Sequence, residues 1–215
     1  VIDFPGHGQI ADPPQPWGVT EYGEATFQLL KELGYTQFDL IAHSFGGRVA
    51  IYLGSHHPEM LRRVVITGGA GIKKAPSPSQ RKRTARFKRM NGLLERLKGI
   101  APLRPAVEKW QGKLRARYGS PDYVRLNEVM RKSFVKIVNE DLLPYLPRIQ
   151  APTLLIWGSN DTETPLWMGQ EMEKDIPDAG LVVLENGSHF AFLEQWQRFV
   201  LIAQTFLLEE NDDGD

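Results

Sequence analysis

The residues that could do chemistry are a serine, an aspartate and a histidine that lie far apart in the chain. Ser44 occurs in the stretch IAHSFGGRVA, Asp161 in WGSNDTETP and His189 in ENGSHF. A serine hydroxyl is a weak nucleophile at neutral pH, and it needs a base that an acid in turn orients. If the fold brings these three side chains together, they predict nucleophilic attack on a carbonyl carbon.

The residues around the serine predict a tight turn between a buried strand and a helix. Residues 38–43, FDLIAH, form a short apolar run, and a helical pattern follows over about 46–56. A turn that lifts one side chain above a sheet needs small residues two positions before and after it, and Ala42 and Gly46 meet that need. The amide of Phe45 would then lie at the helix N-terminus, where it can donate to an oxyanion.

Short apolar runs and helical patterns alternate along much of the chain. Further strands are predicted at residues 1–3, 64–67, 151–158 and 181–185, and further helices at 19–33, 165–174 and 192–209. This alternation predicts an α/β fold with a mainly parallel sheet flanked by helices. Ligands bind beyond the carboxyl ends of the strands in such sheets. The polar residues that follow predicted strands are Asp3, Ser44, Asp161 and His189.

Other residues near the three candidates are expected to have lesser roles. Glu163 is the nearest rival to Asp161 as the acid, but it lies two residues further from its strand. Structural roles are expected for His7 and Asp3 in the first loop, for His43 pointing back into the fold, and for Trp157 and Trp196 in the core.

The charges separate a basic middle from an acidic remainder. Residues 71–148 hold 20 of the 26 Lys and Arg but only 6 of the 26 Asp and Glu, a formal charge of +14 against −14 elsewhere. With its helix-like stretches, this segment predicts a helical insertion into a core of 1–70 and 149–209, followed by an acidic tail at 210–215. The basic charge could steer acidic substrates, but pairing with the acidic remainder is the simpler interpretation.

The composition also excludes several classes of site. The chain has no cysteine, which excludes disulfides, thiolate nucleophiles and cysteine metal sites. No apolar run approaches the roughly 18 to 20 residues of a membrane span. The net charge of zero favours neither nucleic acid nor an anionic membrane as partner. We expect a small-molecule substrate, no metal or organic cofactor and a cytoplasmic location, and the oligomeric state stays open.

These motifs together resemble the α/β-hydrolase superfamily, in the branch that carries a helical cap. DFPGHG resembles the loop after the family's fourth strand, and residues 71–148 match the position of its cap. The resemblance implies a nucleophile elbow at Ser44, with Asp161 as the acid and His189 as the base. It also implies one oxyanion-hole donor, the amide of Phe45. Ala42 stands where the family pattern usually has glycine.

The resemblance also predicts that part of the fold is missing from this chain. The family's first three strands, and the loop with its second oxyanion donor, would precede Val1. The missing third strand would lie between the strand of residues 1–3 and that of 38–43. Buried strands without partners lose backbone hydrogen bonds, so we expect the chain alone to fold poorly or to be inactive.

The resemblance implies acyl transfer on a small ester, thioester or related carbonyl substrate. SHFAFLE at residues 188–194 faintly resembles the histidine loop of carbon–carbon bond hydrolases that act on ring-cleavage products, although Phe190 stands where those carry Trp. A ligand-binding protein that has lost catalysis is a further alternative. The cap side chains that could line an apolar pocket, or form the cap's own small core, are Met90, Trp110, Tyr118, Met130 and Phe134.

Overall fold

A four-stranded parallel sheet forms the centre of the computed structural model, which describes residues 1–73, 78–118 and 121–208. The strands are β1 (Phe38–His43), β2 (Leu61–Thr67), β3 (Thr153–Gly158) and β4 (Ala179–Leu184), and they lie in that order across the sheet. The predicted α/β class with a parallel sheet is therefore confirmed. The acidic tail at 210–215 lies outside the described residues.

Alternate residues of the central strands pack on opposite faces of this sheet, as the two-residue period of a strand requires. Ile66 of β2 and Trp157 of β3 belong to a core shared with α1 (Val19–Glu32), α2 (Phe45–His56) and α7 (Trp167–Asp175). Their neighbours in sequence, Val65 and Ile156, pack instead against the last helix, α9 (Trp196–Leu208). Both faces of the sheet are thus covered, which explains the nearly continuous apolar strands.

Three expectations for the core elements were wrong. Residues 1–3 form no strand, because they pair with no other strand in the described chain, and β1 is an edge strand with Ile41 53% exposed. The helix predicted at 192–209 is interrupted at Gln195, which separates α8 (Ala191–Glu194) from α9. Trp196 begins α9 and is 59% exposed, whereas Trp157 is fully buried as expected.

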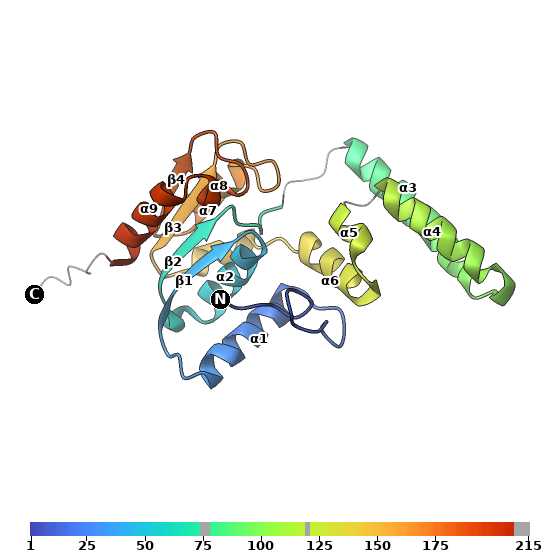
Figure 1. Ribbon diagram of the computed structural model, residues 1–215, viewed down its shortest axis with the longest axis horizontal. Helices are drawn as coiled ribbons and strands as arrows, with labels where there is room; N and C mark the ends of the chain where they lie inside the picture. The colour runs from blue at the N-terminus through green and yellow to red at the C-terminus, as the bar shows by residue number, and fades with distance from the viewer. Residues whose placement is uncertain (74–77, 119–120, 209–215) are drawn as a thin grey trace, which may run out of the picture.

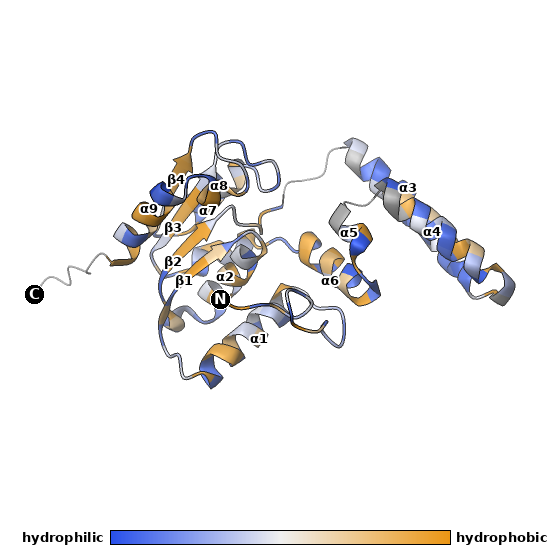
Figure 2. Cartoon of the chain, in the orientation of Figure 1, coloured by the Kyte–Doolittle hydropathy of each residue, from blue (hydrophilic) through white to orange (hydrophobic). Residues whose placement is uncertain are grey.

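The segment between β2 and β3 contains helices. They are α3 (Pro78–Lys98), α4 (Arg104–Tyr118), α5 (Pro121–Arg125) and α6 (Glu128–Asn139), with short 3-10 turns at Ala101–Leu103 and Leu143–Arg148. A further 3-10 turn, Pro58–Met60, precedes β2. Figure 1 shows α3 and α4 as an antiparallel hairpin that extends away from the sheet. Figure 2 shows polar and apolar residues mixed along this hairpin, whereas apolar residues predominate in the strands.

Helix α6 joins this segment to the core. Ser133 is fully buried, and its hydroxyl accepts a hydrogen bond from the amide of Trp17 at 2.9 Å. Lys136 forms an ion pair with Glu21 of α1 at 3.0 Å, so one basic side chain of the segment does pair with the acidic remainder. Because α6 packs on the loop before α1, it lies close to the carboxyl edge of the sheet.

Candidate active site

Ser44 occupies the turn between β1 and α2 that its neighbours in the sequence predict. Its φ of 51° lies in the left-handed region, where the backbone of any residue with a Cβ is strained. Two hydrogen bonds stabilise this conformation: the Ser44 amide donates to Thr67 at 3.2 Å, and the Ser44 carbonyl accepts from Ala70 at 2.9 Å. The neighbouring strand and its loop therefore position the serine.

The steric demand of the turn falls on Gly47 more than on Gly46. A Cβ at Gly46 would make only ordinary contact with the Ala42 methyl group at 3.6 Å. A Cβ at Gly47 would lie 2.8 Å from the Cα of Gly69, a distance that real contacts essentially never show. The first turn of α2 thus packs directly on the loop after β2, and only glycine allows it.

The structure brings the serine, the histidine and the aspartate together at the carboxyl edge of the sheet. His189 follows β4 and Asp161 follows β3, and both are buried. His189 Nε2 lies 3.1 Å from Ser44 Oγ, and His189 Nδ1 lies 2.8 Å from Asp161 Oδ2. With the proton on Nδ1 donated to the carboxylate, Nε2 is free to accept the serine proton.

Thr164 completes the surroundings of the aspartate, and the sequence reasoning missed it. The amides of Glu163 and Thr164 each donate to Asp161 Oδ1 at 2.9 Å. The buried Thr164 hydroxyl lies 2.9 Å from Asp161 Oδ2, 2.9 Å from the Gly68 carbonyl and 3.1 Å from His189 Nδ1. Asp161 accepts from the amide two residues on and so forms an Asx-type turn, but no signal in the sequence singles out Thr164.

Asp161, and not Glu163, lies against the Nδ1 side of the imidazole. Glu163 is exposed, and its Oε2 lies 3.9 Å from the other ring nitrogen, His189 Nε2. His43 lies beside the same ring, with the two ring centroids 4.7 Å apart, and its Nδ1 contacts the Thr67 carbonyl at 2.9 Å. Burial lowers the pKa of His43 and favours its neutral form, although the hydrogen bond to Thr67 opposes the shift.

The first loop packs around Phe45, the first residue of α2. The ring of His7 stacks on the ring of Phe45 with 5.6 Å between centroids, and Phe4 meets Phe45 edge-on at 5.2 Å. The carboxylate of Asp3 lies against Gly8, where a Cβ would come within 2.4 Å of it. These contacts are those of loop-shaping residues. They leave the Phe45 amide at the helix N-terminus, where negative charge is favoured.

The side chains expected to line a pocket are dispersed. Trp110 is 62% exposed and Met90 39% exposed on the hairpin, so neither belongs to a core. Met130 is buried against Gly6, and the ring centroids of Phe134 and Tyr123 lie 6.0 Å apart. The side chain of Tyr118 lies outside the described residues.

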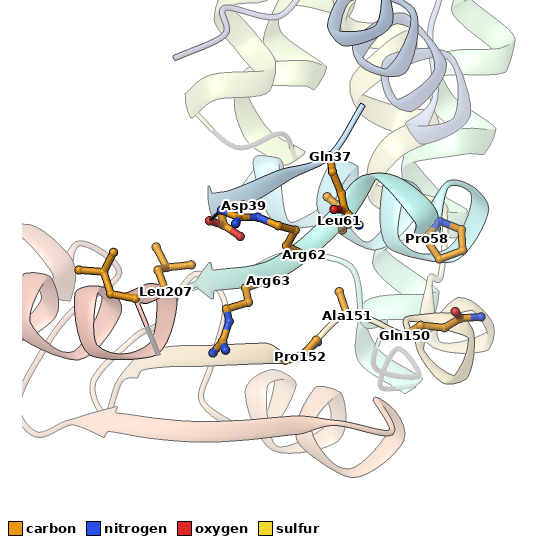
Figure 3. Close-up of a pocket in the computed structure, with 11 residues that line it drawn as sticks. Gln37, Asp39, Pro58, Leu61, Arg62, Arg63, Gln150, Ala151, Pro152 and Leu207 are labelled. Atoms are coloured by element: carbon orange, nitrogen blue, oxygen red, sulfur yellow. Dashed lines mark hydrogen bonds and ion pairs between the residues drawn. The ribbon is translucent and has the colours of Figure 1, made fainter. Parts of the chain in front are cut away.

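A cavity of about 820 Å³ lies at the opposite end of the strands. Figure 3 shows Asp39, Arg62 and Arg63 around it, near the beginnings of β1 and β2, together with Pro152 just before β3. The catalytic candidates follow the other ends of the strands, so this cavity is separate from them.

The described residues contain no cluster of three or more His, Cys, Asp or Glu that could hold a metal ion. Within the same part of the chain, no helix is both long and apolar enough to cross a bilayer.

Two relatives with assigned reactions match nearly the whole chain. A pimeloyl-[acyl-carrier protein] methyl ester esterase of Neisseria meningitidis is 25% identical, over 96% of this chain and 82% of the relative. A 2-hydroxy-6-oxononadienedioate/2-hydroxy-6-oxononatrienedioate hydrolase of a Pseudomonas species is 27% identical, over 96% and 76%. Their names identify both as hydrolases. The first acts on a group bound to a carrier protein, and the second acts on a small molecule.

Solved structures give the same result for the fold. A hydrolase from Pseudomonas aeruginosa superposes with a TM-score of 0.67 at 26% identity, covering 95% of this chain and 77% of that one. The enol-lactonase from Burkholderia xenovorans has a TM-score of 0.68 at 23% identity, covering 96% and 79%. The profile of the Alpha/beta hydrolase family matches residues 1–201. Because that match extends over far more than half of the chain, this protein belongs to the alpha/beta hydrolase family.

Proposed function

We propose that this protein hydrolyses a carboxylic ester, thioester or related carbonyl substrate through an acyl-enzyme on Ser44. The observation that carries the proposal is the hydrogen-bonded series from Ser44 Oγ to His189 Nε2 at 3.1 Å and from His189 Nδ1 to Asp161 Oδ2 at 2.8 Å. An exposed or loosely placed serine would not lie within hydrogen-bond distance of the imidazole. Family membership and the esterase and hydrolase relatives support the same reaction class.

Acylation follows from these contacts. Ser44 Oγ attacks the carbonyl carbon while His189 Nε2 takes its proton, and Asp161 stabilises the imidazolium that forms. The carbonyl oxygen becomes an oxyanion, and the amide of Phe45 at the start of α2 donates to it. As the tetrahedral intermediate collapses, His189 returns the proton to the leaving oxygen.

Deacylation repeats the same proton transfers with water. His189 Nε2 takes a proton from water, the hydroxide adds to the acyl carbon, and Ser44 leaves with the proton from the imidazolium. No step in this scheme draws on a metal or an organic cofactor.

We also propose that residues 71–148 are the cap of this hydrolase, with α6 as the part that lies over the substrate site. Its support is the packing of α6: Met130 lies against Gly6, and the adjacent His7 stacks on Phe45. A helix held at that position can limit the length of the acyl group. The acyl-carrier-protein and methyl ester specificities named for the Neisseria relatives make methyl esters of longer acyl chains a first group of substrates to test.

Carbon–carbon bond hydrolysis is the second candidate reaction. The Pseudomonas relative is named for such a substrate, a 2-hydroxy-6-oxo dienedioate, and it is 27% identical over 96% of this chain. The same serine and histidine would serve both reactions, so only substrates separate them. Hydrolysis of esters but not of ring-cleavage products would favour the esterase assignment. Hydrolysis of ring-cleavage products but not of esters would favour the second candidate.

A fluorescent fluorophosphonate probe tests the proposed mechanism directly. The protein is expressed from its full reading frame beside the Ser44→Ala and His189→Ala variants, and circular dichroism checks that each is folded. We expect labelling of the parent, no labelling of Ser44→Ala, and a fall of at least about 100-fold in the labelling rate of His189→Ala. A folded parent that resists the probe would overturn the hydrolase proposal in favour of a ligand-binding protein.

A further inference from the structure

Glu163 places a second carboxylate beside the histidine, on the side where the substrate reacts. Its Oε2 lies 3.9 Å from His189 Nε2, the nitrogen that also lies 3.1 Å from Ser44 Oγ. The backbone amide of Glu163 donates to Asp161 Oδ1 at 2.9 Å, so the same turn that holds the aspartate also holds this residue at the site. The glutamate side chain is 68% exposed and therefore reaches solvent at the mouth of the site.

The chemistry of acylation brings the leaving group close to this charge. His189 Nε2 must deliver its proton to the leaving oxygen, so that oxygen comes within about 3 Å of Nε2 in the reacting complex. It can then lie no further than about 7 Å from Glu163 Oε2, because the second distance is 3.9 Å. Substituents on the leaving group thus experience the field of the Glu163 carboxylate.

In the part of the chain that the structure describes, the carboxylate of Glu163 has no lysine or arginine partner. Within the described residues, His189 is its only ion-pair contact, and no Lys or Arg lies within 4.0 Å of its carboxylate. Asp161, the other acid of the turn, is buried and already accepts hydrogen bonds on both oxygens. The rim of the site is therefore negative beside Nε2.

We propose that Glu163 makes this site selective for substrates whose leaving group is uncharged or cationic, and that it disfavours leaving groups with a negative charge near the scissile bond. The inference rests on the proposed function, because it assigns the substrate class of the same site. Glu163 acts here through its charge on the substrate and takes no proton in the reaction.

Three acetate esters with similar leaving groups test this selectivity. Acetylcholine and 3,3-dimethylbutyl acetate have nearly the same shape, but only the first has a positive leaving group, and 4-acetoxybutanoate has a negative one. Hydrolysis is followed by acid release at an ionic strength of about 10 mM, where screening between exposed charges is weak. The measured quantity is the ratio of kcat/KM values between substrates, in which general losses of activity cancel.

Glu163→Gln is expected to lower the ratio of kcat/KM for acetylcholine to that for 3,3-dimethylbutyl acetate about three- to tenfold. It should raise the ratio of kcat/KM for 4-acetoxybutanoate to that for 3,3-dimethylbutyl acetate by a similar factor. Glu163→Asp keeps the charge and should retain a larger part of the selectivity. Glu32→Gln removes the same charge from the end of α1 and is expected to leave both ratios unchanged. High salt should reduce the difference between the parent and Glu163→Gln.

Equal ratios in the parent and in Glu163→Gln at low salt would overturn this inference. The fluorophosphonate group carries no charge before it loses fluoride, and its reaction with Glu163→Gln shows whether the serine is still activated. Hydrolysis that survives in Ser44→Ala would instead overturn the proposed function, so the two failures are distinguished.

Discussion

At the scale of single residues, the acid of the site depends on a neighbour that is not itself part of the proton transfer. Asp161 Oδ2 must accept from His189, and the hydroxyl of Thr164 lies 2.9 Å from the same oxygen. A buried hydroxyl that stabilises a carboxylate contributes more than an ordinary hydrogen bond, because the acceptor is charged. In the proposed mechanism, Thr164 is therefore a positioning residue.

Thr164→Val is expected to lower kcat/KM for an ester substrate roughly 10- to 150-fold, because a buried charged acceptor loses a hydrogen bond of about 1.5–3 kcal/mol. Thr164→Ser keeps the hydroxyl and should restore most of the activity. Both variants are compared with the parent by steady-state kinetics across pH. Equal activity of the Val and Ser variants would show that the hydroxyl is dispensable.

His43 gives a second prediction at this scale. Burial holds the pKa of His43 below its ordinary value, so below about pH 6.5 the unfolded chain binds a proton there that the folded chain does not. Its contribution to stability is thus present above pH 6.5 and is lost as the pH falls. His43→Gln should make the urea midpoint less dependent on pH between 8 and 5, and parallel curves for the two proteins would contradict this.

At the scale of elements, the site depends on how closely the loop after β4 crosses the end of β3. A Cβ on Gly158, the last residue of β3, would lie 2.3 Å from the carbonyl oxygens of both Gly187 and Ser188. Those residues directly precede His189. The absence of a side chain at the end of β3 therefore sets the position of His189, the proposed base, which follows β4.

Gly158→Ala is expected to displace the histidine loop, lowering the fluorophosphonate labelling rate at least tenfold and destabilising the fold by about 1–3 kcal/mol. Gly180→Ala is the matched control in the neighbouring strand β4, because a Cβ there meets no atom within 4 Å. That variant should be within about 0.5 kcal/mol of the parent and fully reactive. Normal labelling of Gly158→Ala would show that the loop can adapt.

At the scale of the whole molecule, the sheet and the α3–α4 hairpin differ in how they are stabilised. The sheet is covered on both faces, and Leu155 of β3 is fully buried. The hairpin has few buried apolar residues, among them Val107 and Leu114, and leaves Leu97 43% exposed. Because hydrophobic stabilisation follows buried apolar area, the sheet should carry nearly all of the unfolding free energy.

A leucine-to-alanine substitution in the sheet and another in the hairpin test how the unfolding free energy is divided between them. Leu155→Ala should lower the unfolding free energy by about 2–5 kcal/mol, since it leaves a cavity in the core. Leu97→Ala should change it by less than about 0.5 kcal/mol, since the side chain is already partly in water. Urea unfolding followed by tryptophan fluorescence measures both, and similar losses would mean that the hairpin packs against another surface in solution.

The expectations from the sequence were most accurate where local signals agree. The four strands with regular partners, the turn at Ser44 and the α/β class follow from apolar runs, glycine positions and their alternation. The strand at residues 1–3 was wrong because strand formation needs a partner, which an apolar run cannot supply. Trp196 was wrong because a large apolar residue at a helix start can lie on the outer face as easily as the inner one.

The sequence by itself determined the chemical types available and the order in which they occur: a serine on a strand-to-helix turn, then an acid, then a histidine, each after a strand. Only the tertiary structure decided which acid meets the imidazole, that Thr164 supports it, and that Glu163 lies at the reacting nitrogen. The physical reason is that hydrogen bonds extend about 3 Å, whereas these residues are separated by up to 145 positions in the chain. Parallel strands bring their ends together, and the final ångströms depend on loop packing.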